Sequence, residues 1–332
     1  GAVFWMVIIA FFSMSAKFVS CTLGQLYRKI NDDGSVSGGP MYYLDRALEE
    51  KGRGFGVFGK ILGMMYALFI IGGAFGGGNM FQANQSYEIF GKLIGIPSWL
   101  YGILLAVLVA FVIVGGIKRI GQTTEKIVPF MVVLYVGASL FVILTNLGQL
   151  PGVLSSMFSQ AFAPDADYGG FIGALVTGIK RAVFSNEGGV GSASIAHSAA
   201  KTDEPVREGI VAMIGPFIDT IVVCFMTASV ILITKDNNPL YQVGGGINGA
   251  ELTSAAFGSV ISWFPYILAI VVFLFSFSTM ISWYYYGDKG WKYLFGSSSI
   301  KVYQGMYLGC VVLGSVASLG NVMTFSDMMI LS

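Results

Sequence analysis

Long apolar runs separated by short polar stretches dominate the pattern of this chain. A helix that crosses a bilayer needs about 20 apolar residues, and eight runs come close to or exceed that length. They cover residues 1–27, 61–87, 99–117, 128–147, 170–200, 208–234, 258–286 and 302–322. The pattern predicts an all-α integral membrane protein in which residues 1–332 form a single transmembrane domain.

The fifth run, residues 170–200, is interrupted by polar residues and glycines. Its centre reads Lys180, Arg181, Ala182, Val183, Phe184, Ser185, Asn186, Glu187, Gly188, Gly189, Val190, Gly191 and Ser192. Backbone that stops being helical at membrane depth is tolerated only where it lines a cavity or is covered by protein. Secondary transporters use such broken helices to offer backbone groups and helix dipoles to a substrate and its coupling ion. We therefore predict a discontinuous helix at about 170–200, unwound after Phe184.

Composition supports a membrane location and excludes several function classes. The chain is 55% hydrophobic and 11% charged, whereas soluble domains carry about 25% charged residues. The 19 Lys and Arg residues nearly balance the 18 Asp and Glu residues, which argues against a nucleic-acid-binding surface. One histidine, His197, and three cysteines without metal-ligand spacing provide no metal centre, disulfide framework or catalytic set. We expect no enzyme activity.

Cations in the connecting loops alternate along the chain and predict its orientation. Lys and Arg number six in 28–60, one in 88–98, three in 118–127, none in 148–169, two in 201–207, one in 235–257 and three in 287–301. Cytoplasmic loops carry the excess of cations, so loop 28–60 is predicted to be cytoplasmic, with one short interfacial helix around Met41–Lys51. Because apolar runs meet both ends of the sequence, we also expect further segments beyond each end.

Polar side chains in the second run form the first candidate site. Asn79 and Gln82 are three residues apart and therefore share a helix face with Phe75 and Ser86. Amides at membrane depth need partners, which can be neighbouring helices or a ligand. We favour a pocket wall, because the preceding glycines would let a ligand approach the helix closely.

The seventh run contains the second candidate site, around Ser278 and Thr279. Such hydroxyls often bond to carbonyls of their own helix, but hydroxyl oxygens also suit a hard cation such as sodium. Trp283 lies four residues after Thr279, so its indole shares that face and would restrict a pocket to small ligands.

Asp219, midway along the sixth run, is a carboxylate at membrane depth and hence a functional candidate. It can instead pair with Lys17, Lys180 or Arg181, and we favour this structural pairing. His197 is expected to cap or pack near the end of the broken helix.

With these motifs in view, the chain resembles the alanine or glycine:cation symporter family, the sodium:alanine symporters of bacteria and archaea. The resemblance covers essentially the whole length. It is carried by Gly38–Gly39–Pro40–Met41–Tyr42–Tyr43, by Gly78–Asn79–Met80–Phe81–Gln82–Ala83–Asn84, by Phe184 to Ser192 with Ile195–Ala196–His197, and by Gly215–Pro216–Phe217–Ile218–Asp219–Thr220.

The resemblance implies a LeuT-type fold with two inverted five-helix repeats. On that template the eight runs look like helices two to nine, with the tenth beginning after Phe325. The family's first helix, which also unwinds and contacts substrate and sodium, is then absent from this sequence. We therefore expect this stretch alone not to transport.

The resemblance also assigns the site residues. It implies substrate contacts at Asn79, Phe81, Gln82, Asn186, Gly188, Gly189, Thr279 and Trp283, and a sodium (Na⁺) site at Ser278 and Thr279. Glu187 can bind the substrate ammonium or pair with Lys180 or Arg181, and we favour the pairing. The bulk around Trp283 favours alanine, glycine or serine over larger substrates.

Together these features predict a sodium-coupled importer of small neutral amino acids that works by alternating access in the plasma membrane. Its expected partners are the amino acid, sodium and the lipid bilayer, with no obligate protein partner. Proton coupling through Asp219 or Glu187 is the nearest alternative. A channel is less favoured, because the polar residues cluster at a few depths instead of lining a continuous pore.

Overall fold

The computed structural model describes residues 1–332 except 33, 164–169, 239, 242–248 and 332, so the end of the predicted external loop 148–169 lies outside the described residues. The α-helices are α1 (Ala2–Leu26), α2 (Pro40–Glu49), α3 (Arg53–Phe75), α4 (Phe81–Ser86), α5 (Ser98–Ile113), α6 (Gly116–Thr145), α7 (Leu150–Ser159), α8 (Gly170–Asn186), α9 (Ala193–His197), α10 (Pro205–Pro216), α11 (Phe225–Ile233), α12 (Gly249–Gly258), α13 (Phe264–Phe295), α14 (Ile300–Val316) and α15 (Leu319–Leu331). Wider π-helical turns form η1 (Gly76–Met80), η2 (Tyr87–Gly91) and η5 (Phe217–Cys224). Short 3₁₀ turns form η3 (Leu147–Gln149) and η6 (Ser297–Ser299), and β1 (Lys29–Ile30) pairs antiparallel with β2 (Val36–Ser37).

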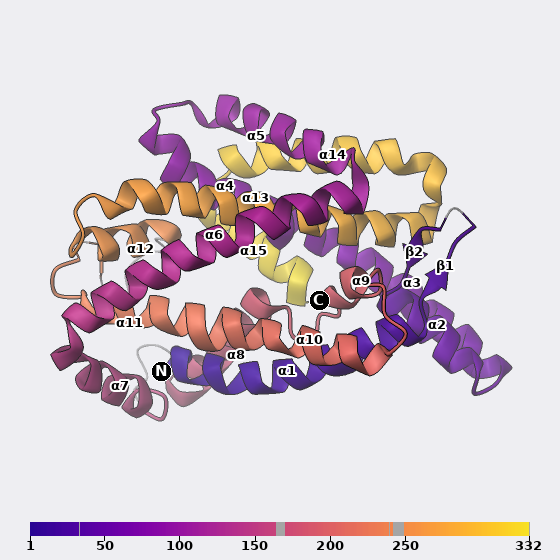
Figure 1. Ribbon diagram of the computed structural model, residues 1–332, viewed down its shortest axis with the longest axis horizontal. Helices are drawn as coiled ribbons and strands as arrows, with labels where there is room; N and C mark the ends of the chain where they lie inside the picture. Colours follow the sequence, from indigo (N-terminus) through magenta and orange to yellow (C-terminus); the bar gives the residue numbers. More distant parts are fainter. Residues whose placement is uncertain (33, 164–169, 239, 242–248, 332) are drawn as a thin grey trace.

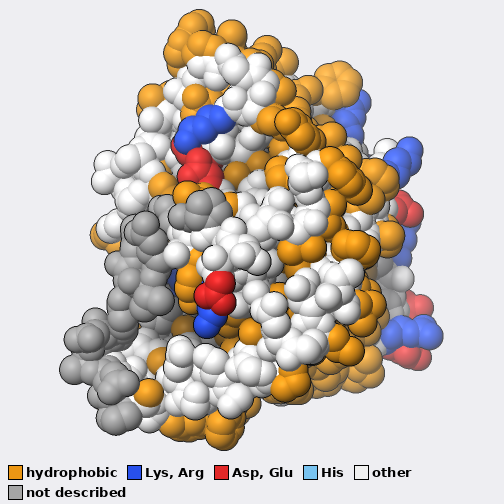
Figure 2. Space-filling view, turned by 90° about the vertical axis from the view of Figure 1, so that its left-hand side faces the viewer, with side chains coloured by type: hydrophobic (Ala, Val, Ile, Leu, Met, Phe, Trp, Pro, Cys, Tyr) orange, Lys and Arg blue, Asp and Glu red, His pale blue; other side chains and the backbone are white. Residues whose placement is uncertain are grey.

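The long helices run side by side along the longest axis of the molecule (Figure 1). The β1–β2 hairpin and α2 lie at one end of this bundle, on the right in Figure 1, whereas α7 and α12 lie at the other end. Figure 2 faces that second end and shows small groups of adjacent positive and negative side chains among apolar and uncharged ones. The helix α2 matches the short helix predicted around Met41–Lys51.

Five helical stretches in the described residues are long and apolar enough to cross a bilayer. They are Ala2–Leu26, Arg53–Gly91, Gly116–Thr145, Pro205–Ile233 and Phe264–Phe295. The predicted runs 99–117, 170–200 and 302–322 correspond to the shorter helices α5, α8 with α9, and α14. The apolar helices confirm an all-α membrane protein.

Two predicted boundaries are wrong in the same way. The fourth apolar run begins at residue 128, but α6 already begins at Gly116. The seventh run ends at residue 286, but α13 continues to Phe295. Lys, Arg, Glu and Gln propagate a helix nearly as well as Leu, so the helices extend past the apolar stretch. The length of an apolar run therefore indicates the part of a helix that crosses the bilayer, but it does not indicate where the helix begins or ends.

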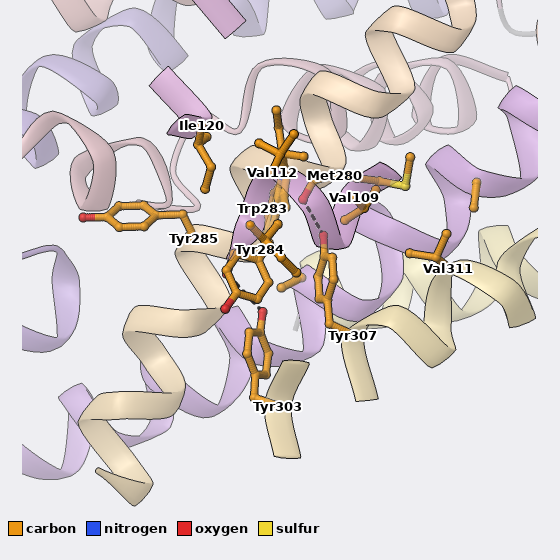
Figure 3. Packing of buried hydrophobic residues seen from close by; sticks show 14 of the residues in the cluster. Val109, Val112, Ile120, Met280, Trp283, Tyr284, Tyr285, Tyr303, Tyr307 and Val311 are labelled. Atoms are coloured by element: carbon orange, nitrogen blue, oxygen red, sulfur yellow. Dashed lines mark hydrogen bonds between the residues drawn. The ribbon is translucent and has the colours of Figure 1, made fainter. Parts of the chain in front are cut away.

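The best-packed core surrounds α13, where it meets α14 and the α3–η1 stretch (Figure 3). The buried hydroxyl of Tyr307 donates to the carbonyl oxygen of Met280 at 2.6 Å. The hydroxyl of Tyr303 donates to the carbonyl oxygen of Tyr284 at 3.2 Å. Two side chains of α14 thus satisfy backbone carbonyls of α13, which fixes the position of one helix against the other. Figure 3 shows Tyr284 directed toward Tyr303 and Tyr307, whereas Tyr285, also in the cluster, points away from these two rings.

Candidate functional site

Helical structure stops at Asn186, the end of α8, and resumes at Ala193, the start of α9. The residues between, which we name the 187–192 segment, contain three positive φ angles: 56° at Glu187, 86° at Gly189 and 79° at Gly191. Glycine adopts this conformation freely, but for glutamate it costs about 1–2 kcal/mol. The surroundings must therefore hold Glu187 in place.

The carboxylate of Glu187 makes the hydrogen bonds that stabilise this backbone conformation. One oxygen accepts a hydrogen bond from the hydroxyl of Ser192, and the other accepts one from the indole Nε1–H of Trp283 at 2.8 Å. The first bond closes the segment on itself, and the second ties it to α13. Hydrogen bonds to a charged group contribute about 1.5–3 kcal/mol each, enough to offset the backbone cost.

The favoured pairing of Glu187 with Lys180 or Arg181 is wrong. The Nη2 nitrogen of Arg181 instead donates to both carboxylate oxygens of Asp327 on α15, at 2.8 and 2.6 Å. Glu187 is the first residue beyond α8, and its left-handed backbone places the carboxylate toward α13 instead of along the helix that carries the two cations. Glu187 is close to Lys180 and Arg181 in sequence, but because α8 ends before Glu187 its side chain does not lie beside these cations.

A cavity of about 390 Å³ lies against the 187–192 segment. It is lined by Tyr66, Phe69, Ile70, Gly73, Val183, Gly188, Gly189, Val190, Trp283, Met329 and Ile330. Its volume falls in the range typical of small-molecule sites, and its lining is mostly apolar with a few polar groups, as in such sites. The structure therefore brings the predicted residues Gly188, Gly189 and Trp283 together around one space.

A second cavity of about 560 Å³ lies between α1, α2 and the same segment. Tyr66, Gly189 and Val190 line both spaces. The hydroxyl of Tyr66 is buried and has no hydrogen-bond partner among the described residues. An unsatisfied buried hydroxyl next to a cavity can bond to a ligand at no cost in existing bonds.

The side chain of Trp283 packs between Gly78, Tyr286 and Glu187. A Cβ atom added to Gly78 would lie 2.3 Å from the Cγ atom of Trp283, so only glycine permits this approach. The ring of Tyr286 meets the indole edge-on at 5.4 Å, and Glu187 holds the indole nitrogen. The glycines before Asn79 thus make room for a protein side chain.

The predicted site residues of the second run do not line the 390 Å³ cavity. The amide nitrogen of Asn79 donates to the carbonyl oxygen of Tyr307 at 2.8 Å, which is an interhelical bond. The amide nitrogen of Gln82 donates to the carbonyl oxygen of Gly77 at 3.0 Å. Phe81 packs edge-on against Phe184, with ring centroids 5.0 Å apart.

Asn186 fixes the end of α8 and does not line the cavity. Its side-chain oxygen accepts from the backbone N–H of Gly188 at 2.8 Å, and its nitrogen donates to the hydroxyl of Thr220 at 2.9 Å. Through Thr220, the beginning of the 187–192 segment is linked to the π-helical turn η5.

Asp219, in the same turn, does not form the predicted ion pair with Lys17, Lys180 or Arg181. Among the described residues it lies within 4 Å of no cation, and its carboxylate accepts from the hydroxyls of Ser185 and Thr220. A carboxylate at membrane depth needs donors, and the hydroxyls of Ser185 and Thr220 meet that need in place of a cation.

Ser278 and Thr279 lie on α13, one turn before Trp283. The hydroxyl of Ser278 donates to the carbonyl oxygen of Phe275 at 2.9 Å, and its oxygen keeps lone pairs that a cation could use. His197 ends α9 and contacts Glu208 of α10 at 2.5 Å.

Sequence reasoning missed most of the cavity wall, including Tyr66, Met329 and Ile330. Each sits in an apolar stretch where aromatic and aliphatic residues are the rule, so nothing in the pattern distinguished them. The sequence did indicate a role for Glu187, because a carboxylate among glycines at membrane depth needs hydrogen-bond donors.

Long apolar helices packed around a polar non-helical segment, with a cavity on either side of it, define a multi-pass membrane protein of the transporter class. The chain belongs to the sodium:alanine symporter family, whose sequence pattern matches residues 1–332. It is therefore a plasma membrane protein of a transporter family and not an enzyme.

Three relatives show how this family is represented. The sodium/alanine symporter AgcS of Methanococcus maripaludis is 40% identical over 98% of this chain and 71% of its own length. The probable sodium/glutamine symporter GlnT of Bacillus subtilis is 35% identical over 99% of this chain and 66% of its own length. The putative sodium/proton-dependent alanine carrier protein YrbD of Bacillus subtilis is 36% identical over 89% of this chain and 61% of its own length.

Proposed function

We propose that this chain carries the substrate-binding part of a sodium-coupled symporter for small neutral amino acids such as alanine, glycine and serine. The observation that carries the proposal is the 187–192 segment, which Glu187 holds against Trp283 at the wall of a 390 Å³ cavity. The names of the relatives AgcS, a sodium/alanine symporter, and YrbD, a putative alanine carrier, support alanine as cargo.

In this proposal α8 and α9 are two halves of one discontinuous transmembrane helix within a LeuT-type inverted-repeat bundle. The segment between them lies near mid-depth, because it meets Trp283 of α13 and a Cβ on Gly188 would touch Ser13 in the middle of α1. Such a break exposes backbone groups to cargo.

In the 390 Å³ cavity, the ammonium and carboxylate groups of the amino acid bind to different partners. The carbonyls at the C-terminal end of α8 carry the partial negative charge of the helix dipole and attract the ammonium group. The hydroxyl of Tyr66 is available to donate to the carboxylate. The indole of Trp283 and the ring of Phe69 limit the space beyond the α-carbon.

Sodium binds in this proposal at the hydroxyls of Ser278 and Thr279, one turn from Trp283. Asn79, Phe81 and Gln82 then act behind the cavity, where they position η1 and α4 against α14 and α8. Because sodium and cargo both stabilise the same arrangement of α13 and the 187–192 segment, each raises the affinity for the other by the same factor.

Proton coupling is the second candidate, and the surroundings of Asp219 favour it. This carboxylate meets hydroxyl donors and no cation within 4 Å in the described part of the chain. It can therefore gain a proton without breaking an ion pair. Uptake by the full-length protein in sodium-free buffer under a pH gradient, abolished by Asp219→Asn, would establish this version.

The decisive experiment for sodium coupling measures alanine affinity of the full-length protein in sodium and in choline buffer. We expect sodium to raise the affinity about five- to 150-fold, the usual range of coupling between sites. Thr279→Ala should reduce this factor, whereas Ser282→Ala, which removes a hydroxyl bonded to its own helix at 2.9 Å, should not. Equal affinity in the two buffers would exclude sodium coupling.

A further inference from the structure

A separate cavity of about 880 Å³ opens at the end of the bundle that carries the β1–β2 hairpin. The hairpin, the α5–α6 junction, the α9–α10 connection and α13 contribute to its wall. Its charged lining residues are Arg28, Lys118, Lys201, Asp203 and Lys289. Four cations face one carboxylate, so the cavity has an excess of positive charge.

Arg28, Lys118 and Lys201 have no carboxylate oxygen within 4 Å among the described residues. Arg28 donates instead to backbone carbonyls of Ser198, Ala200 and Thr202. Lys118 and Lys201 are exposed. Backbone carbonyls satisfy donors without cancelling charge, so the cavity attracts an anion from outside the chain.

One side of this cavity continues into a surface that suits lipid tails. Phe111 and Val114, at the end of α5, are 72% and 74% exposed. The next residues, Gly115 to Lys118, line the cavity and begin α6. The first N–H groups of a helix lack intrahelical partners and favour an anion. An apolar strip therefore leads directly to cations and free backbone donors.

We propose that this cavity binds the phosphate of an anionic phospholipid, whose acyl chain lies along Phe111 and Val114. The 28–60 loop, which the cation bias places in the cytoplasm, contributes Arg28, so the lipid belongs to the cytoplasmic leaflet. A soluble oxyanion would match the charges but would gain nothing from the apolar strip. The lipid site is independent of the transport proposal, since binding alone reveals it.

The test measures binding of phosphatidylglycerol and phosphatidylcholine to the full-length purified protein by native mass spectrometry. We expect wild type to prefer phosphatidylglycerol. Each lysine near an anionic headgroup contributes roughly a fivefold factor, so the double variant Lys118→Gln/Lys201→Gln should lose about 25-fold in affinity for this lipid. Lys118→Arg/Lys201→Arg should keep it.

The matched control is Lys51→Gln/Lys60→Gln, which removes two cations of the 28–60 loop that do not line the cavity. This variant should bind phosphatidylglycerol like wild type. Equal loss in both double variants, or no loss in either, would overturn the proposal. A third arm adds inorganic phosphate in detergent: if it displaces phosphatidylglycerol fully at millimolar concentration, the site recognises a soluble anion and the lipid assignment is wrong.

Discussion

Trp283 and Tyr284 are neighbours on α13 and both belong to its buried cluster, yet their side chains face two differently built regions. Tyr284 lies in the aromatic cluster with Tyr303 and Tyr307, where rings pack at 5.4–5.5 Å and hydroxyls donate to backbone carbonyls. Trp283 faces the 187–192 segment, which is flanked by two cavities and tied to α13 through one carboxylate. The first region is closely packed, and the second depends on a few polar bonds.

The difference indicates which part of the bundle can move. Close packing has one arrangement, since any displacement loses many contacts together. The 187–192 segment has space on both sides and is tied to α13 by the hydrogen bond between Glu187 and Trp283, so its displacement loses fewer contacts. Helix α13 is therefore closely packed on its Tyr284 side, whereas on its Trp283 side it makes a contact that can break.

The largest effect is expected from Glu187→Ala, which removes both hydrogen bonds made by the Glu187 carboxylate. With about 1.5–3 kcal/mol per bond to a charged group, we expect alanine affinity of the full-length protein to fall by at least about tenfold. Thermal stability should fall as well, because the indole N–H of Trp283 and the hydroxyl of Ser192 lose their acceptor. Binding and melting curves measured on one preparation check this. The exposed Glu125→Ala is the control, and a loss of stability without loss of binding would contradict the assignment.

Tyr307→Phe tests the packed region. It removes the donor to the Met280 carbonyl at 2.6 Å and leaves a buried acceptor, so the free energy of unfolding should fall by about 1–3 kcal/mol. Tyr266→Phe on α13, where the residue is 60% exposed, should be neutral. Unchanged melting of the Tyr307 variant would show that the two regions do not differ as described.

Gly78→Ala tests the boundary between the regions, because the new methyl group meets Trp283. Overpacking of this kind costs about 1–3 kcal/mol, which the indole can relieve by giving up part of its bond to Glu187. We expect weaker alanine binding together with altered tryptophan fluorescence. Gly305→Ala, with open space around it on α14, should be neutral. Normal binding by Gly78→Ala would mean that the indole is not held as the structure shows.

Arg181→Gln should have the smallest effect. The ion pair with Asp327 is partly exposed, at 32% and 26% for the two side chains, and such pairs contribute about 0–1 kcal/mol. We expect a slight fall in melting temperature, equal to that caused by Asp327→Asn. The double variant Arg181→Gln/Asp327→Asn should melt no lower than either single variant, because each change removes the same ion pair. A larger loss would mean that the pair also supports the cavity wall through α15.

The sequence predicted the class of fold well, because apolar length is a direct consequence of the bilayer. It also indicated that α8 ends near Glu187, because glycines seldom continue a helix and a carboxylate at membrane depth needs donors. It did not predict the π-helical turns, which alter the faces of Asn79 and Asp219. Nor could it identify Tyr66, whose role depends on the space beside it and not on its neighbours in sequence.

Tyr66, Gly189 and Val190 line both cavities. Because the two spaces share these residues, a displacement of any one of them changes both volumes together. A shift no larger than a side chain can therefore redistribute space between the two cavities.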